Sequence, residues 1–394
     1  MNNDPIVIVS IARTPIGGFG GELADLSATK LGSVAIEATL ARSSVAAEDV
    51  DEVYMGCVLP AGLGQAPARQ AALGAGLPVT TGCTTINKVC GSGMKTVMIA
   101  HDSLVVGENQ VIIAGGMESM TNAPYLLEKH RGGQRLGHGH VKDHMFLDGL
   151  EDAYDPGRLM GTFAQATADD YGFSRELQDE YAIRSTTRAQ NAIKNGDFDY
   201  EIAPVVIKTR RGESTILTDE QPGKAKLDKI PLLKPAFAKD GTVTAANSSS
   251  ISDGAAAMLL MRESTAKAKG QEPLCRIVGY ATNSRKPEHF TIAPVGAVEQ
   301  LLAKVNWQVS DVDLFEINEA FAIVTMAAIR DLGLDEAKVN VNGGATALGH
   351  PLGASGARIL VTLIAALKNK GLKRGIASLC LGGGEATAIA VEMV

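Results

Sequence analysis

The sequence predicts an α/β protein in which two similar domains pack face to face. A segment near the N-terminus recurs in the C-terminal part of the chain, and both parts alternate apolar strand-like runs with amphipathic helix-like runs. Strands that alternate with helices of this length form α/β units with largely buried sheets. At 394 residues the chain also exceeds what one hydrophobic core usually serves.

The repeat is clearest between residues 34–53 and 296–315, which align without a gap. Each copy is expected to form an amphipathic helix, a short polar turn and a buried strand. Further along, Ser92-Gly93 corresponds to Ser355-Gly356, and each pair opens an apolar helical run. Seven of the 20 aligned pairs are identical: Ala35/Ala297, Glu37/Glu299, Leu40/Leu302, Ala41/Ala303, Asp49/Asp311, Val50/Val312 and Asp51/Asp313.

A region of different character, residues 120–248, lies between the two similar parts. It contains the glycine- and histidine-rich segment from Gly132 to His144 and a predicted helix from Ser174 to Asn195, with Ser174 as its N-cap. We expect it to be an inserted region that covers the substrate. Its basic cluster is interpreted as a solvated loop: Lys208, Arg210 and Arg211.

Composition excludes several classes of protein. The formal net charge of -7 and the absence of a long basic run argue against nucleic acid as a partner. No apolar stretch is long enough to span a bilayer, and Met1 to Pro5 lead into an apolar run without a signal-peptide pattern, so we expect a cytoplasmic protein that does not enter the membrane. An odd set of cysteines without a C-x-x-C pair disfavours disulfides and a zinc knuckle: Cys57, Cys83, Cys90, Cys275 and Cys380.

Cys90 is the strongest candidate for a reactive residue. It follows a strand-like run and precedes Gly91, Ser92 and Gly93 at the start of a predicted helix. Free backbone N–H groups and the positive end of the helix dipole favour a thiolate there, which predicts a pKa below the ordinary thiol value of about 8.5. The alternative is a buried structural cysteine beside a turn.

Three further segments bring polar residues among small ones. His350 lies in a run rich in glycine and alanine, which predicts an exposed base in a glycine-walled cleft. Cys380 comes just before Gly382, Gly383 and Gly384, whose backbone N–H groups are candidates for binding an oxyanion. Asn318 follows a buried strand, where catalytic side chains of α/β folds tend to lie.

Four motifs in this order resemble the signature set of the thiolase family: N-K-V-C-G-S-G, N-E-A-F, G-H-P-x-G-x-S-G and C-x-G-G-G. The resemblance extends from Ile6 to the C-terminus. It implies the thiolase fold, two similar α/β domains stacked in five αβαβα layers with an inserted loop domain. The implied division places residues 1–119 and 249–268 in the N-terminal domain, 120–248 in the loop domain and 269–394 in the C-terminal domain.

The resemblance also implies residue roles. Cys90 would accept the acyl group, His350 would activate it, and Cys380 would move a proton to or from the second substrate. Asn318 would orient a water that forms one oxyanion hole with His350. The backbone N–H groups of Cys90 and Gly382 would form the other, so the chemistry needs no metal.

Binding residues follow from the same motifs. Met160 matches a methionine placed against the acyl group, Ser249 matches a serine at the pantetheine arm of CoA, and Phe321 closes the N-E-A-F motif beside the substrate. The chain departs from the biosynthetic subgroup of the family at three places. Leu159 replaces a histidine, Phe290 stands where a methionine is common beside the acyl pocket, and Gly223 replaces a CoA-contacting arginine, with Lys224 adjacent as a possible substitute.

The function implied is reversible Claisen condensation of two acetyl-CoA molecules to acetoacetyl-CoA and CoA, through an acyl group on Cys90. CoA thioesters are the substrates, no cofactor is expected, and the Cys90-Gly91-Ser92-Gly93 form favours short acyl groups. The alternative is a degradative 3-ketoacyl-CoA thiolase of fatty-acid β-oxidation acting on longer chains.

Three other interpretations are weighed against this one. A β-ketoacyl synthase would have a second histidine where Cys380 stands, and a non-enzymatic relative would have a gap in the catalytic set. A zinc site at His138, His140 and His144 is possible from spacing alone. A glycine-rich loop that helps subunits associate explains Gly132 to His144 better, and we expect a homotetramer built from dimers.

Overall fold

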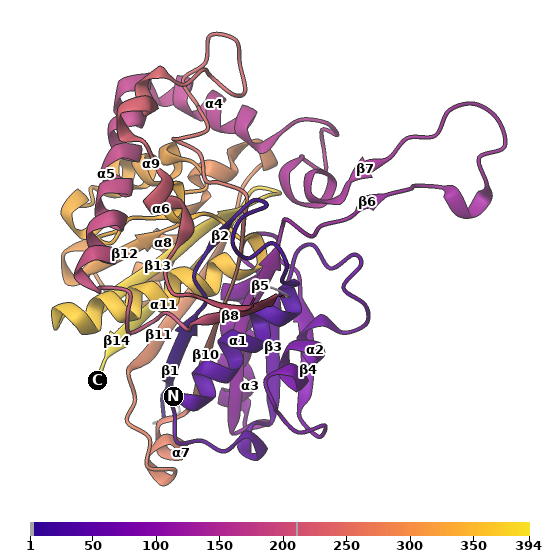
Figure 1. The fold of residues 1–394 in the computed structure, drawn as a ribbon. Helices are drawn as coiled ribbons and strands as arrows, with labels where there is room; N and C mark the ends of the chain where they lie inside the picture. The colour runs from indigo at the N-terminus through magenta and orange to yellow at the C-terminus, as the bar shows by residue number, and fades with distance from the viewer. Residues whose placement is uncertain (1–3, 210–211) are drawn as a thin grey trace.

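The computed structural model describes residues 4–209 and 212–394, which form a mixed α/β structure around one long sheet (Figure 1). The strand order is β12-β13-β14-β11-β1-β10-β5-β3-β4, with the short β2 paired to β10. Its strands are β1 (Ile6–Arg13), β2 (Gly17–Gly18), β3 (Glu52–Gly56), β4 (Gly82–Ile86), β5 (Val111–Ser119), β10 (Ser252–Arg262), β11 (Cys275–Ser284), β12 (Leu314–Ile317), β13 (Arg374–Leu381) and β14 (Glu385–Met393).

The predicted duplication is confirmed by the strand order. From the centre of the sheet outward, β1, β10, β5 and β3 form one half, and β11, β14, β13 and β12 form the other in the same sequence of pairings. In each half the first two pairings are antiparallel and the third is parallel. The halves join through β1 and β11, where Val7 pairs with Arg276 and Ile8 with Cys275.

Helices complete the predicted five layers. Helices α1 and α2 cover the outer face of the first half, α8 and α9 cover the outer face of the second, and α3 and α11 lie between the halves. Helix α11 contacts β5 and β10 as well as β12 and β13. The helices of the two halves are α1 (Ala28–Ala41), α2 (Pro67–Gly74), α3 (Ser92–Val106), α7 (Glu263–Ala268), α8 (Ala293–Val305), α9 (Ala322–Leu332), α10 (Ala345–Leu348) and α11 (Leu352–Lys370), with short turns η1 (Ala47–Asp49), η5 (Pro287–Ile292), η6 (Val309–Asp311) and η7 (Glu336–Lys338).

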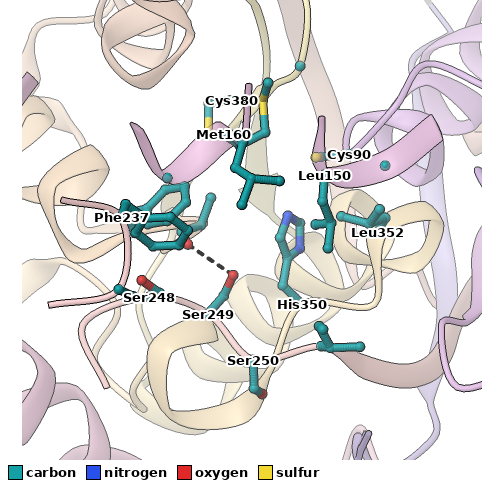
Figure 2. Close-up of a pocket in the computed structure, with 18 of the residues that line it drawn as sticks. Cys90, Leu150, Met160, Phe237, Ser248, Ser249, Ser250, His350, Leu352 and Cys380 are labelled. Carbon is teal, nitrogen blue, oxygen red and sulfur yellow. Dashed lines mark hydrogen bonds between the residues drawn. The ribbon is translucent and has the colours of Figure 1, made fainter. Parts of the chain in front are cut away.

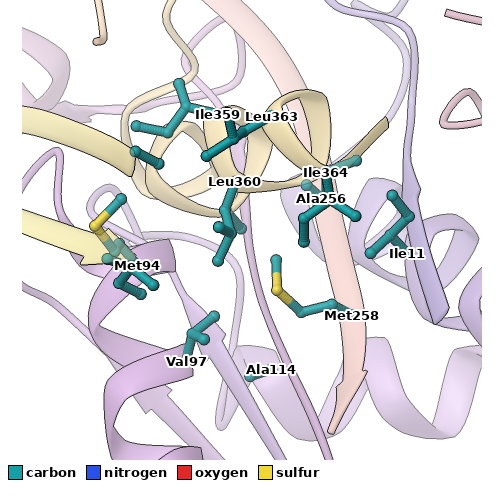
Figure 3. Packing of buried hydrophobic residues seen from close by; sticks show 14 of the residues in the cluster. Ile11, Met94, Val97, Ala114, Ala256, Met258, Ile359, Leu360, Leu363 and Ile364 are labelled. Atoms are coloured by element: carbon teal, nitrogen blue, oxygen red, sulfur yellow. The ribbon is translucent and has the colours of Figure 1, made fainter. Parts of the chain in front are cut away.

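The central layer explains the matching Ser-Gly pairs. Helix α11 is buried along its whole length up to Leu367, as expected of a helix that is apolar on all sides (Figure 3). It passes α3 so closely that a Cβ atom on Gly93 would lie 2.8 Å from the backbone N of Ala357, and one on Gly356 would lie 2.5 Å from that of Met94. Glycine is required at both positions because only the missing side chain permits this approach.

Residues 120–248, the predicted loop domain, lie between β5 and β10 along the chain. Ser174 caps α5 as predicted, since its hydroxyl accepts the N–H of Leu177. Lys208 lies in strand β8 with an exposed side chain, whereas Arg210 and Arg211 lie outside the described residues, as do residues 1–3 of the N-terminal segment. The elements here are β6 (Tyr125–Leu126), η2 (His130–Gly132), β7 (Lys142–Asp143), η3 (Phe146–Leu150), α4 (Met160–Tyr171), α5 (Arg175–Asn195), β8 (Val205–Thr209), β9 (Gly212–Ile216), α6 (Glu220–Lys224) and η4 (Leu227–Leu232).

After this region the chain returns to the first half, because β10 lies between β1 and β5. Buried ion pairs connect β1 to the inserted region. Arg13 of β1 contacts the carboxylates of Glu201 and Asp219, and its Nη1 lies 2.7 Å from Asp219 Oδ1. The domain limits at 119/120, 248/249 and 268/269 stay a prediction.

The segment between β6 and β7 projects from the body as an arm (Figure 1). Residues 127–141 of this arm are exposed, including His138 and His140, while His144 is buried at its base beside Asp148. Within residues 4–209 and 212–394, no group of three or more His, Cys, Asp or Glu is placed to hold a metal ion. Over the same residues, no helix combines the length and apolar character needed to cross a bilayer.

Candidate active site

A cavity of about 400 Å³ brings the predicted catalytic residues together (Figure 2). Cys90 enters from the turn before α3, His350 from the loop before α11 and Cys380 from the end of β13. The rest of the lining is almost entirely apolar or small: Phe146, Gly149, Leu150, Leu159, Met160, Gly161, Ala236, Phe237, Ala245, Ser248, Ser249, Ser250, Ile251, Phe290, Ala320, Phe321, Leu352 and Gly382.

The turn that presents Cys90 is held by its own side chains. Val89 has a φ of 47°, a left-handed conformation that is strained for a β-branched residue. Asn87 Oδ1 accepts the N–H of Val89 at 2.9 Å. Ser92 Oγ accepts the N–H of Lys88 at 2.8 Å and donates to Val89 O at 2.6 Å. The motif N-K-V-C-G-S therefore builds a fixed turn that aims the thiol into the cavity.

Burial decides the ionisation of Cys90, and here the sequence prediction is wrong. Cys90 does lie just before the N-terminus of α3, with Gly91 as the N-cap. Burial nevertheless raises the pKa of Cys90 to about 11, although the backbone N–H groups of Gly382 and of Cys90 itself act to lower it. Removing the thiolate sulfur from water costs more free energy than the two N–H groups and the helix N-terminus recover. Cys90 is therefore a thiol in the resting protein.

His350 is a neutral base, but a buried one, so the prediction of an exposed histidine is wrong. Burial, with a smaller contribution from Arg358, lowers the pKa of His350 to about 3. Its Nδ1 lies 2.5 Å from Ser355 Oγ, and that hydroxyl donates to Pro351 O at 2.8 Å. Since the only proton of Ser355 is used, its oxygen accepts Nδ1–H, and Nε2 of His350 carries the free lone pair.

Asn318 lies behind His350 rather than on the wall of the cavity. It follows β12, and its Nδ2 donates to His350 Nε2 at 3.4 Å. The side chain of Asn318 can therefore act on the reaction through the imidazole of His350.

The neighbouring Glu319 holds the surrounding loops together. Its buried carboxylate accepts hydrogen bonds from α5, from the loop after η7 and from the start of α10. These contacts connect the N-E-A-F segment, the inserted region and the chain that leads to His350. The donors are Tyr181 Oη, Ser185 Oγ, Asn340 Nδ2, and both N–H and Oγ1 of Thr346.

Cys380 is buried, and burial together with the nearby Cys90 raises its pKa well above the ordinary value. Of the three glycines after it, only Gly382 lines the cavity. Gly383 and Gly384 have φ values of 86° and 89° and form the turn into β14. The predicted contribution of all three N–H groups to one oxyanion site is therefore limited to Gly382, whose N–H acts on the Cys90 sulfur.

The predicted acyl-binding residues line the same cavity. Met160, Phe290 and Phe321 supply apolar walls, and Leu159 stands beside Met160. The Ser249 hydroxyl donates to Ala320 O at 2.9 Å, which leaves its oxygen able to accept. The ring of Phe290 packs edge-on against Phe163 at 6.3 Å between centroids.

Lys224 is the one predicted binding residue outside this cavity. It lines an adjacent hollow of about 350 Å³ that shares Ala245, Ser248 and Ser250 with the first. Its ammonium forms an ion pair with Glu220 of the same helix, so its charge is already partly neutralised. Two other lysines line this hollow as well: Lys226 and Lys229.

Several residues of the site have no role assigned from the sequence, although Ser355 stands in the G-H-P-x-G-x-S-G motif. Ser355 and Arg358 act on His350 and Asn318 from α11, and Arg358 is signalled in the sequence as one charge at the head of the apolar run up to Leu367. Apolar residues of the lining carry no such signal, because a buried leucine or phenylalanine is usually core. These are Phe146, Leu150, Phe237 and Leu352.

Comparison with known proteins identifies similar chains. Residues 6–264 match the family model described as thiolase, N-terminal domain, and residues 271–393 match thiolase, C-terminal domain. The acetyl-CoA acetyltransferase of Cupriavidus necator is 49% identical over 389 residues, which cover 98% of this chain and 99% of that protein. The crystal structure of the Bacillus anthracis acetyl-CoA acetyltransferase has 44% identity and a TM-score of 0.96, covering 99% of each chain. The Ascaris suum thiolase Acat5 in complex with coenzyme A has 41% identity and a TM-score of 0.93, covering 99% of this chain and 100% of that one.

Proposed function

Because this chain belongs to the thiolase family, we propose that it is an acetyl-CoA C-acetyltransferase, which interconverts two acetyl-CoA molecules with acetoacetyl-CoA and CoA. One observation carries the proposal at the level of chemistry. A buried thiol, a neutral imidazole with an unprotonated Nε2, and a second thiol line one apolar cavity.

In the first step Cys90 attacks the thioester carbonyl. The pKa values of about 11 for Cys90 and about 3 for His350 make a resting thiolate–imidazolium pair strongly unfavourable. His350 Nε2 therefore takes the thiol proton only as the sulfur bonds to the carbonyl carbon. The N–H groups of Cys90 and Gly382 stabilise the oxyanion, and the proton then leaves with CoA sulfur.

In the second step Cys380 acts on the second acetyl-CoA. Cys380 Sγ takes a proton from the methyl group while its own thiol proton passes to His350 Nε2, and the resulting enolate attacks the acetyl carbon on Cys90. His350, now protonated on Nε2, and the water that Asn318 would orient stabilise the enolate oxygen, as the resemblance implies, and the Cys90 sulfur takes the proton back from His350 as it leaves. Charge develops on that oxygen only in the reaction, so fixed donors lower the barrier without stabilising the ground state.

The CoA moiety is assigned to the two adjoining hollows. The pantetheine arm would pass Ser249 in the catalytic cavity, and the phosphates would lie in the hollow lined by Lys224, Lys226 and Lys229. Since Lys224 is paired with Glu220 and Lys229 with Asp228, Lys226 is the better candidate for phosphate contact.

Short acyl groups fit the catalytic cavity best. Met160 and Phe290 close its apolar side, and the same 400 Å³ must also admit the end of the pantetheine arm. Two of the three similar proteins carry acetyl-CoA acetyltransferase names, and the third is named a thiolase in complex with coenzyme A, which supports the acetyl-CoA assignment over the degradative alternative with longer chains.

The direct test is thiolysis. Mixing the protein with acetoacetyl-CoA and CoA should produce acetyl-CoA, and incubation with acetyl-CoA alone should place an acetyl group on the peptide that contains Cys90. Mass spectrometry that found the acetyl group on Cys380 or Cys57 would contradict the assignment of the nucleophile. No metal or cofactor should be needed in the assay.

We expect a homotetramer, with the arm as a contact between copies. Three apolar side chains between β6 and β7 are exposed on the arm, and Leu136 is 94% exposed, so association would remove them from water: Leu127, Leu136 and Val141. Sedimentation equilibrium at micromolar concentration should give four times the chain mass of 41.1 kDa. Substituting the three residues by serine should lower the number of chains per assembly, and a monomeric unmodified protein would contradict the prediction.

Cytoplasmic location and a role in lipid metabolism stay predictions.

A further inference from the structure

Arg358 is a buried arginine close to the catalytic cavity that does not line it. It lies in α11 in the central layer and is 2% exposed. Its Nη1 donates to Glu316 Oε1 at 3.1 Å, and its Nη2 donates to Asn318 Oδ1 at 3.4 Å. Burying a guanidinium is costly even when it is paired, so an arginine at the centre of an apolar helix needs a reason.

Its contact determines which way the Asn318 amide points. An arginine side chain only donates hydrogen bonds, so the amide atom that faces Arg358 must be the oxygen. The amide nitrogen is then turned towards His350 Nε2, to which it donates. Without the guanidinium, the two ends of the amide would differ little in their surroundings, and the group could flip or rotate.

The hydrogen bonds that Ser355 and Asn318 make with His350 require the same tautomer of the imidazole. Ser355 accepts Nδ1–H, so Nε2 has no proton of its own and can accept from Asn318. Arg358, one turn of α11 beyond Ser355, supplies the matching constraint on Asn318. The helix thus orients both members of the pair from a single rigid surface.

We propose that Arg358 is a positioning residue for the condensation step: held by Glu316, its guanidinium keeps the Asn318 amide nitrogen directed at His350 and at the water that Asn318 would orient towards the enolate oxygen. The inference rests on the proposed function and deepens it. Arg358 does not line the cavity and does not touch substrate, so it acts through Asn318.

The charge of Arg358 has a second effect, on the imidazole. It contributes to the lowered pKa of His350, because a nearby positive charge disfavours imidazolium. Removing it should raise the pKa of His350 and move the acidic limb of the rate profile to higher pH. The other groups that face this site are the thiols Cys90 and Cys380 in the cavity and the charged residues acting on Arg358: Glu316, Arg13, Glu201 and Glu319.

Two substitutions separate orientation from charge. Arg358→Met removes both, and Arg358→Lys keeps the charge without the planar fork. In Arg358→Met, kcat for condensation should fall about 10- to 100-fold, with the KM for acetyl-CoA changed by less than about threefold. The rate of Cys90 acetylation at alkaline pH should fall far less than kcat for condensation. The acidic limb of the pH dependence of acetylation should move to higher pH. In Arg358→Lys the acidic limb should return to its original position while the loss in condensation remains.

Controls keep the result interpretable. Thr362→Val, one turn further along α11, removes a buried hydrogen bond to Glu201 without reaching Asn318, and should condense at the unmodified rate. If Arg358→Met does not fold, Glu316→Gln loosens the same arginine and should give a smaller loss in condensation alone. Equal losses in acetylation and condensation, or a pH profile unchanged in Arg358→Met, would overturn the proposal. Absence of turnover in the unmodified protein would instead overturn the proposed function.

Discussion

Cys90→Ser should lose acetylation altogether, and turnover should fall by at least about 1,000-fold in both directions. A serine hydroxyl is far harder to deprotonate than a thiol, and His350, with a pKa lowered to about 3, is a weak base. The buried thiol can react only because sulfur bonds to carbon as its proton leaves. Oxygen in the same place would need a stronger base than the cavity offers. Peptide mass spectrometry and single-turnover release of CoA measure the loss.

Cys380→Ser should behave differently, because Cys380 acts on the second substrate. The variant should still be acetylated on Cys90, within about tenfold of the unmodified rate, while condensation and thiolysis fall by at least about 1,000-fold. Accumulated acetyl-enzyme in this variant is the observation that separates the two cysteines.

Cys83→Ser is the matched control, since Cys83 lies in the edge strand β4, partly exposed and away from the cavity. Its rates should equal those of the unmodified protein. Loss of acetylation and condensation to the same extent in Cys380→Ser would contradict the division of roles.

Phe290→Ala should admit longer acyl chains. Phe290 lines the catalytic cavity, and Phe163, against which it packs, lines a separate polar cleft on the other side. The two rings therefore form a wall between the cavity and the cleft. Each methylene that enters the space of the lost ring gains about 0.8 kcal/mol, so the ratio of kcat/KM for eight-carbon over four-carbon 3-ketoacyl-CoA should rise by about 200-fold.

The ring is also part of the core, and its removal should destabilise the protein by about 3–5 kcal/mol, seen as a lower Tm. Phe290→Met keeps most of the volume and should keep the short-chain preference, which makes it the matched control. A steady rise in kcat/KM from four to eight carbons in the unmodified protein would reject the short-chain assignment. It would favour the degradative alternative.

The sequence alone determined the family and the fold class, and it predicted three reacting residues, Cys90, His350 and Cys380, that the structure brings into one cavity. The duplication between residues 34–53 and 296–315 predicts two similar domains, and the strand order confirms this because each half repeats the same pairings. The catalytic motifs can be recognised in the sequence because their residues have local structural roles. Gly93 permits helix contact, and Asn87 and Ser92 hold the turn of Cys90.

Tertiary structure decided the electrostatics. The helix N-terminus at Cys90 predicts a lowered pKa, yet burial raises it to about 11, and His350 is buried where exposure was expected. Desolvation depends on everything that surrounds a group, including residues far away in the sequence, so no local pattern reports it.

Tertiary structure also decided which polar residues meet. Lys224 follows the position of the expected arginine, but it forms an ion pair with Glu220, and Lys229 of the same hollow forms one with Asp228, which favours Lys226 for phosphate contact. Arg358 stands 40 positions after Asn318, and only the packing of α11 against the second half of the sheet brings its guanidinium to the amide. Residue types and spacing specify the reacting atoms, whereas their orientation and charge depend on the buried neighbours that the folded layers supply.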